Sequence, residues 1–169
     1  MKNSKILFLT QAGLIAALYV VLTVLFSAFS FGEMQVRVSE MLTILPFFLP
    51  AAIPGLFAGC IIGNIIGGAV FADIVFGSLA TLVGAVVTYL IRGHSMYLAP
   101  IGPIAANTLI VPFVLKYAYA VNLPIFFMML TVGAGEVISC GVLGVCLGKV
   151  LRKPPTRSEE RRVGKECRS

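Results

Sequence analysis

The stretch LPIFFMMLTVGAGEVISCGVLGVCLGK occupies residues 123–149 and carries a single carboxylate, Glu136, in an otherwise apolar run. This run is long enough to cross a bilayer, whose hydrocarbon core takes about 20 apolar residues in a helix. A carboxylate at that depth costs roughly 2.5 kcal/mol or more unless it is paired, protonated or facing a polar cavity. The stretch therefore predicts a membrane helix with Glu136 at a functional site.

The composition extends this interpretation to the whole chain, which has 169 residues, 59% of them hydrophobic and 12% charged. A soluble domain of this length cannot bury so much apolar surface. We therefore expect an all-α membrane protein embedded in the lipid bilayer, with one integral-membrane domain over residues 1–153.

Hydropathy predicts a compact bundle of six transmembrane helices, at residues 6–29, at two positions within 41–72, and at 74–91, 98–121 and 123–151. The second span is short and rich in proline, so we expect it to be kinked or only partly helical. Basic residues lie before the first span, after the fourth and after the sixth. By the positive-inside rule, an even number of spans then puts the N- and C-termini in the cytoplasm.

Residues 154–169 differ in character from the rest of the chain. They include RSEERRVGKEC, and one codon choice for this segment resembles a widely used sequencing-library adapter. We expect a non-native tail, the alternative being an ordinary basic cytoplasmic tail. Removing residues 157–169 takes away five basic and three acidic residues, so the formal net charge falls from +6 to +4. The remaining positive charge follows the membrane topology and does not suggest nucleic acid.

Small residues at four-residue spacing mark two faces for close helix packing. The third span carries such a row, which we expect to pack against a neighbouring helix of the same chain: Gly55, Gly59, Gly63 and Gly67. In the first span, Ala12 and Ala16 form a second strip, with Gly13 and Ala17 beside them. This strip could be used inside the bundle, or it could be a flat docking face for another membrane subunit.

The loop FGEMQVRVSE, residues 31–40, concentrates polar side chains between the first two spans, including Arg37 and Glu40. Polar and apolar residues alternate along it, which is typical of a short extended segment with one apolar face. We expect this external loop either to fold over the mouth of the bundle as a lid or to be solvated.

Two amides, Asn64 in the third span and Asn107 in the fifth, need hydrogen-bond partners at membrane depth. Together with Glu136 they indicate a shared polar pocket. Asp73 is either an ordinary boundary residue or the N-cap of the fourth span. Gly133 and Cys140 lie about one turn on either side of Glu136 and leave room for a ligand, and a planar heterocycle with adjacent N–H groups would suit its carboxylate.

The chain has no P-loop, HExxH or GxSxG pattern, and its single histidine is His94. The cysteines of the predicted spans lack the spacing of metal ligands. We therefore expect no enzyme, no metal site and no cofactor.

Four stretches carry a resemblance to a known family: QVRVSEMLTILPFFLPAAIPGLFAGCIIGN (35–64), FADIVFGSLATLVGAVVTYL (71–90), YLAPIGPIAANTLIVPF (97–113) and GEVISCGVLG (135–144). They resemble the QueT family, the substrate-binding membrane subunits for queuosine precursors. The likeness runs over residues 5–152 and leaves out the tail.

The resemblance implies an S component of an energy-coupling factor (ECF) transporter in a bacterial cell membrane. Such a subunit docks onto a transmembrane coupling subunit and two ATPase subunits, and its substrate is expected to be a deazaguanine-type base. Docking in this family uses small residues of the first helix, here Ala12 and Ala16. In the binding mode we expect, Glu136 accepts hydrogen bonds from the base, and Asn107 and Asn64 complete the polar contacts.

We expect the base to enter under the loop that bears Arg37 and Glu40. A cationic aminomethyl group on the base would need a second carboxylate as its partner. Glu33, Glu40 or Asp73 could supply that group. Two other functions stay open: an S component for another heterocyclic vitamin, and a ligand-free membrane scaffold that uses the glycine row as its partner interface.

Overall fold

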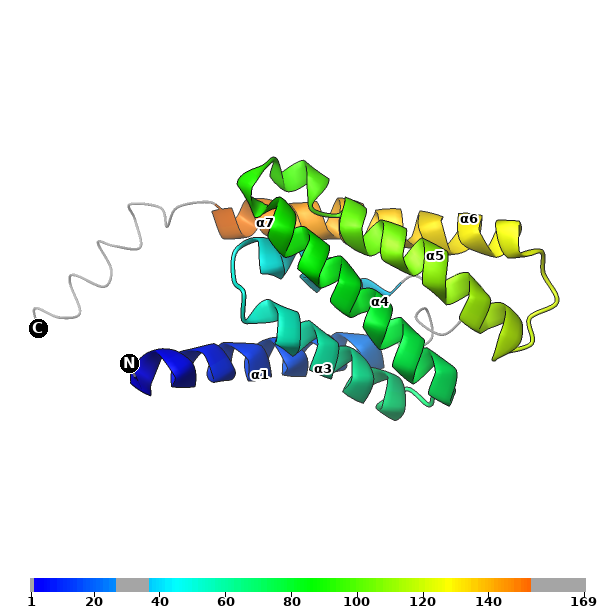
Figure 1. Ribbon diagram of the computed structural model, residues 1–169, viewed down its shortest axis with the longest axis horizontal. Coiled ribbons are helices and arrows are strands. Elements are labelled where there is room, and N and C mark those ends of the chain that lie inside the picture. The colour runs from blue at the N-terminus through cyan, green and yellow to red at the C-terminus, as the bar shows by residue number, and fades with distance from the viewer. Residues whose placement is uncertain (1, 27–36, 153–169) are drawn as a thin grey trace, which may run out of the picture.

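Helices make up almost all of the chain that the structure, a computed structural model, describes: residues 2–26 and 37–152. The elements are α1 (Lys2–Leu25), the 3-10 helix η1 (Val38–Phe47), α3 (Ala52–Ile66), α4 (Phe71–Leu90), the short 3-10 turns η2 (Ile91–Gly93) and η3 (Met96–Leu98), α5 (Ile101–Tyr117), α6 (Ile125–Glu136), the π-helix η4 (Val137–Gly144) and α7 (Val145–Arg152). Figure 1 shows α6, η4 and α7 as one continuous rod alongside α5. The predicted all-helical fold is therefore confirmed.

Among the described residues, four helical stretches are long and apolar enough to cross a membrane: Ser4–Leu25, Phe71–Gly93, Met96–Tyr117 and Ile125–Arg152. The second and third predicted spans correspond to the shorter helices Val38–Phe47 and Ala52–Ile66. Prolines explain the shortness, because Pro46 lies inside η1, Pro50 lies between the two helices, and Pro54 lies in the first turn of α3. The second span is short, as predicted, but it is helical throughout Val38–Phe47 as a 3-10 helix, whereas the sequence predicted a kinked or only partly helical segment.

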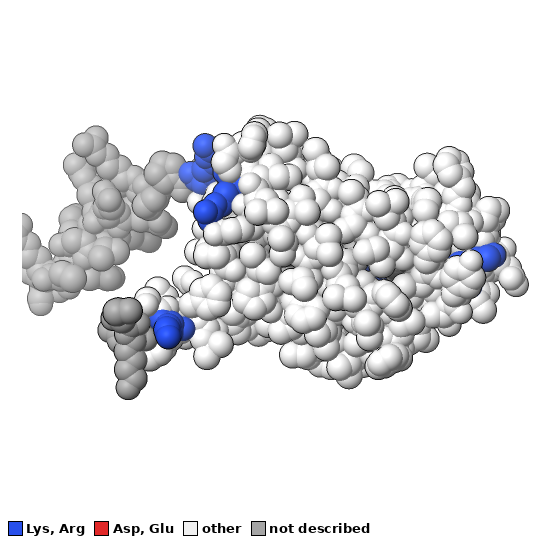
Figure 2. All heavy atoms as spheres, viewed as in Figure 1, with Lys and Arg blue, Asp and Glu red and all other residues white. Residues whose placement is uncertain are grey.

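The start of α1 and the end of α7 lie at the same end of the bundle (Figure 1). In Figure 2, most of the visible lysine and arginine side chains of the described residues gather at this end. A chain that crosses a membrane an even number of times with its basic ends on one side produces this distribution. Residues 27–36, which hold most of the predicted lid, and the tail from 153 onward lie outside the described residues.

The glycine row of α3 packs against α1, as predicted. A Cβ atom built on Gly55 would lie 2.7 Å from the carbonyl oxygen of Ala12, and one on Gly59 would lie 2.8 Å from the Cβ of Tyr19 and 3.0 Å from the Cα of Ala16. Only glycine allows so close a backbone approach. Ala12 and Ala16 therefore lie against α3, which is the internal use that the sequence left open, and their role in docking stays a prediction.

The helices α4 and α5 also cross at very short range. A Cβ on Gly84 would lie 2.6 Å from the Cα of Pro103, and one on Gly102 would lie 2.8 Å from the Cβ of Val87. This crossing fixes α4 against α5 and turns a polar stripe of α4 toward the interior, formed by Asp73, Ser78, Thr81 and Thr88. The stripe forms one wall of the candidate site.

Candidate functional site

A buried polar interior runs through the bundle. Its members come from nearly every helix and are at most 5% exposed: Thr23, Arg37, Ser39, Glu40, Thr43, Asn64, Asp73, Ser78, Thr81, Thr88, Asn107, Glu136 and Ser139. Polar groups at such a depth have no bulk water to bond with, so each needs a partner in the protein or a ligand. The arrangement of these partners defines two connected clusters.

The first cluster is centred on Glu136, the last residue of α6, whose side chain is 2% exposed. Its Oε1 accepts a hydrogen bond from Nδ2 of Asn107 at 2.9 Å, and its Oε2 accepts one from the Cys140 thiol at 3.2 Å. The π-helix η4 begins at the next residue, and Ser139 and Cys140 within it are both buried. Single π turns within α-helices occur frequently at functional sites, where they redirect side chains.

Glu40 lies on the other side of this cluster, on η1, with its side chain 0% exposed. Its Oε1 accepts hydrogen bonds from the Tyr19 hydroxyl at 2.5 Å and from the Thr81 hydroxyl at 3.0 Å. The expectation that Glu40 belongs to an external loop is wrong. Its alternating neighbourhood suggested an extended segment, but the chain from Val38 onward is helical and inserts Glu40 between α1 and α4.

Glu40 and Glu136 face each other across the cluster. One oxygen of each carboxylate and the sulfur of Cys140 all lie within 4.8 Å of one another. Two ionised carboxylates this close in a medium of low polarity repel strongly, so the pair requires a proton, a cation or a hydrogen-bonding ligand. The arrangement is thus a buried pair of acids that favours a proton, a cation or a ligand rich in hydrogen-bond donors.

The second cluster is centred on an ion pair between Arg37 and Asp73. Nη2 of Arg37 lies 3.0 Å from Oδ2 and 3.2 Å from Oδ1 of Asp73, and both side chains are almost completely buried. The Tyr119 hydroxyl donates to Oδ2 of Asp73 at 3.2 Å, and partial burial together with the Asp73 charge raises the pKa of Tyr119. Tyr119 therefore stays protonated and available as a donor.

Asp73 lies in the first turn of α4 but does not cap it. The N-cap residue is Val70, without a side-chain cap bond, and both Asp73 oxygens point to Arg37. Of the two predicted roles, N-cap and boundary residue, the first is therefore wrong. Asp73 does lie at the boundary of α4, but it also forms the ion pair that joins the start of α4 to Arg37, the residue that precedes η1.

Asn64 belongs to the second cluster. Its Nδ2 lies 3.4 Å from the backbone oxygen of Asp73 and 3.6 Å from the Cys60 sulfur, which in turn accepts from Thr81 at 3.5 Å. The predicted shared pocket of two amides and Glu136 is thus divided. Asn107 contacts Glu136 directly, whereas Asn64 reaches the Glu40 side only through Cys60 and Thr81.

Several members of the site were not singled out by the sequence. Tyr19 follows Ala12 and Ala16 on one face of α1. Thr81 lies between Gly77 and Gly84 on α4, and in both places the pattern predicts only helix packing. A hydroxyl on the small-residue face of a membrane helix is the signal that could have identified them.

Some buried polar atoms have no hydrogen-bond partner among the described residues: Glu40 Oε2, Ser78 Oγ, Asn107 Oδ1, Thr108 Oγ1 and Ser139 Oγ. Two of these atoms belong directly to the first cluster, because Glu40 is one of the two carboxylates and the amide of Asn107 donates to the other. Unsatisfied buried polar atoms are costly, and their concentration at one place is a feature of ligand sites.

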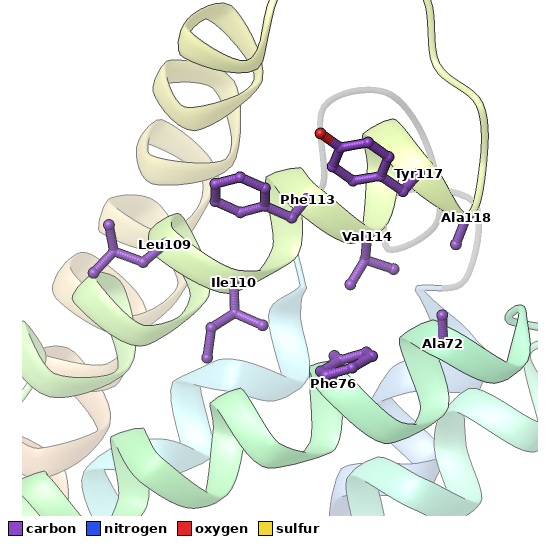
Figure 3. A pocket seen from close by; sticks show the side chains of 8 residues that line it. All are labelled: Ala72, Phe76, Leu109, Ile110, Phe113, Val114, Tyr117 and Ala118. Atoms are coloured by element: carbon purple, nitrogen blue, oxygen red, sulfur yellow. The ribbon is translucent and has the colours of Figure 1, made fainter.

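An apolar groove lies elsewhere, between α4 and α5 (Figure 3), with a volume of about 530 Å³. Its lining is Ala72, Phe76, Leu109, Ile110, Phe113, Val114, Tyr117 and Ala118. None of these residues belongs to the two polar clusters. Apart from the Tyr117 hydroxyl, the side chains of this lining are apolar, so the groove offers a polar ligand few hydrogen-bonding groups.

Comparisons with known proteins agree with the resemblance seen in the sequence. The sequence model of a family described as "QueT transporter" matches residues 9–153. A similar curated protein, "Queuosine precursor transporter QueT" of Lactococcus lactis subsp. cremoris (strain MG1363), is 41% identical over 85 residues. The match covers 49% of this chain and 50% of that protein, so it spans about half the length of the relative. No solved structure matches significantly.

Proposed function

This chain belongs to the QueT transporter family, and from that membership we propose that it is the substrate-binding membrane subunit, or S component, of an ECF-type importer for a queuosine precursor. As a multi-pass membrane protein of a transporter family, it binds and moves its substrate and leaves it chemically unchanged. The proposed location is the bacterial cell membrane, with both termini in the cytoplasm.

One observation carries the proposal: Glu40 and Glu136 face each other in the buried interior beside Asn107, and Glu40 Oε2 and Asn107 Oδ1 have no hydrogen-bond partner among the described residues. A deazaguanine base carries adjacent N–H donors on its ring and exocyclic amine, and a carboxylate accepts two such donors side by side. In the proposed complex Glu136 accepts these donors and Asn107 lines the same face.

Arg37, Asp73 and Asn64 have a positioning role in this proposal. Asp73 holds Arg37, and the backbone N–H of Glu40 bonds to the carbonyl of Arg37 at 2.9 Å. The ion pair thereby fixes the turn from which Glu40 projects. Because the carboxylates are almost fully buried, entry of a base requires neighbouring helices to separate, and the partner subunits would drive the later release inward.

Binding of a labelled precursor to the purified protein tests the function. We expect saturable binding and a higher melting temperature, because a ligand at 100 times its Kd stabilises the folded state by about 2.7 kcal/mol. A flavin and a pterin serve as matched heterocycle controls. Stabilisation by one of these instead would assign the site to another vitamin, and no stabilisation by any heterocycle would favour the scaffold function.

Docking to the coupling subunit is proposed to use the free face of α1, next to the strip that α3 covers. Gly13 and Ala17 are exposed and four residues apart, and a Cβ on Gly13 would meet nothing within 4 Å. This face is flat and open, whereas Ala12 lies against Gly55. A coupling helix could approach it closely, as helices do at small residues in membranes.

Bulky residues on this free face should therefore block assembly without harming the subunit. We expect Gly13→Leu and Ala17→Leu to abolish co-purification with the coupling subunit and ATPases while ligand binding stays unchanged. Gly59→Leu is the contrasting variant, because its side chain would collide with α1 and destabilise the fold. Intact complexes with both α1 variants would contradict docking through this face.

A further inference from the structure

We propose that the acid pair of Glu40 and Glu136 selects a ligand bearing a protonated primary amine, so that the aminomethyl form of the deazaguanine base binds in preference to the nitrile form. This inference rests on the proposed function and names the substrate class of the same site. Three independent features of the interior carry it: its charge, its supply of donors and acceptors, and the separation of its oxygen atoms.

The interior holds more acidic than basic side chains. Arg37 and Asp73 form an ion pair, which leaves Glu40 and Glu136 as two further acids in the same buried region. The donors that reach Glu40 and Glu136 are neutral hydroxyl, amide and thiol groups. A neutral ligand would bind with a proton held by one of the two acids, whereas a cation between them allows both to be ionised and attracts both.

The unpartnered atoms around the pair need donors. Glu40 Oε2 is an acceptor, and Asn107 Oδ1 is one as well, because its Nδ2 already donates to Glu136. An ammonium group brings three N–H donors and no acceptor, which matches this shortage. A nitrile brings only an acceptor and would leave Glu40 Oε2 without a partner.

The spacing suits one nitrogen atom. Charge-assisted N–H···O bonds are about 2.7–2.9 Å long, so a nitrogen between two oxygens can bridge a gap of up to about 5.6 Å. One carboxylate oxygen of Glu40 and one of Glu136 lie within 4.8 Å of each other. A single ammonium can therefore bond to both carboxylates.

Competition binding with three ligands on one scaffold tests the proposal. They are the aminomethyl base, the nitrile base and the hydroxymethyl analogue, which is close in size to the first but uncharged. We expect the aminomethyl base to bind at least about tenfold more tightly than either neutral ligand. Equal or tighter binding of the nitrile would overturn the inference and leave the transport function standing, whereas failure of all three to bind would overturn both.

Two variants identify the source of the preference. Glu40→Gln should reduce the tenfold preference to about threefold or less, mainly through weaker binding of the aminomethyl base. Thr81→Val is the matched control, since it removes a hydrogen bond to the same carboxylate and keeps its charge. If Glu40→Gln does not fold, the ratio of ligand affinities in the unaltered protein still decides. Equal affinities that require an added metal ion would assign the acid pair to an inorganic cation and overturn the proposal.

Discussion

Replacing Glu136 by glutamine is expected to weaken binding of the deazaguanine base by about 100-fold. Two hydrogen bonds from the base to an ionised carboxylate contribute about 1.5–3 kcal/mol each, and the variant loses the charge and one acceptor. Isothermal titration or a filter assay with labelled precursor measures the change. Cys140→Ala is the matched control, because it removes a donor to Oε2 of Glu136 and preserves the charge. Its loss should stay below about tenfold.

The melting temperature of the ligand-free Glu136→Gln variant distinguishes a binding role for Glu136 from a structural one. Glutamine retains an oxygen that can accept from Asn107, the partner at 2.9 Å, and it removes a negative charge opposite Glu40. We therefore expect the melting temperature of the ligand-free variant to stay level or rise. A lower melting temperature with unchanged affinity would mean that Glu136 stabilises the bundle through Asn107 and does not contact the base.

The fold was largely predictable because its determinants are local in sequence. Long apolar runs gave the four full-length helices, proline spacing gave the irregular second span, and the glycine row gave the α1–α3 contact. Glu136 was recognisable as a site residue because one carboxylate in an apolar run is an energetic anomaly at any register. The contact between Glu136 and Asn107 was predictable on the same ground, because each of these polar side chains needs a polar partner among apolar helices.

The rest of the site depends on contacts that no local pattern contains. Glu40 bonds to Tyr19 on α1 and to Thr81 on α4, and each looked like part of a packing face. Arg37 pairs with Asp73 across 36 positions of the chain. The segment with Arg37 and Glu40 has the period of an extended strand. The structure instead buries this base and this acid at the start of a 3-10 helix, where each bonds to a side chain of α4.

Breaking the Arg37–Asp73 ion pair should produce the largest loss of stability of any single change proposed for this protein. Removing one partner of a buried pair typically costs about 3–5 kcal/mol, because the other charge is left uncompensated. We expect this loss for Arg37→Gln and a similar one for Asp73→Asn. Reversible unfolding in mixed micelles, followed by circular dichroism, gives the free energy of unfolding.

Arg92→Gln is the control for this measurement. Arg92 is exposed, and among the interactions described for it the guanidinium contacts only the ring of Tyr89. The variant should therefore lose less than about 1 kcal/mol of unfolding free energy.

The double variant Arg37→Gln/Asp73→Asn decides whether the pair acts as a unit. With both charges gone, neither remains buried alone, so we expect its free energy of unfolding to lie above that of either single variant. The coupling between the two positions should exceed about 2 kcal/mol, within the range seen for residues of one buried network. Additive losses would mean that each side chain acts through other partners, such as Tyr119 for Asp73.

Because the ion pair fixes the turn that carries Glu40, the double variant should also recover stability without recovering full affinity for the aminomethyl base. That separation between stability and binding is the result expected of a positioning pair, and a purely structural pair would restore both together.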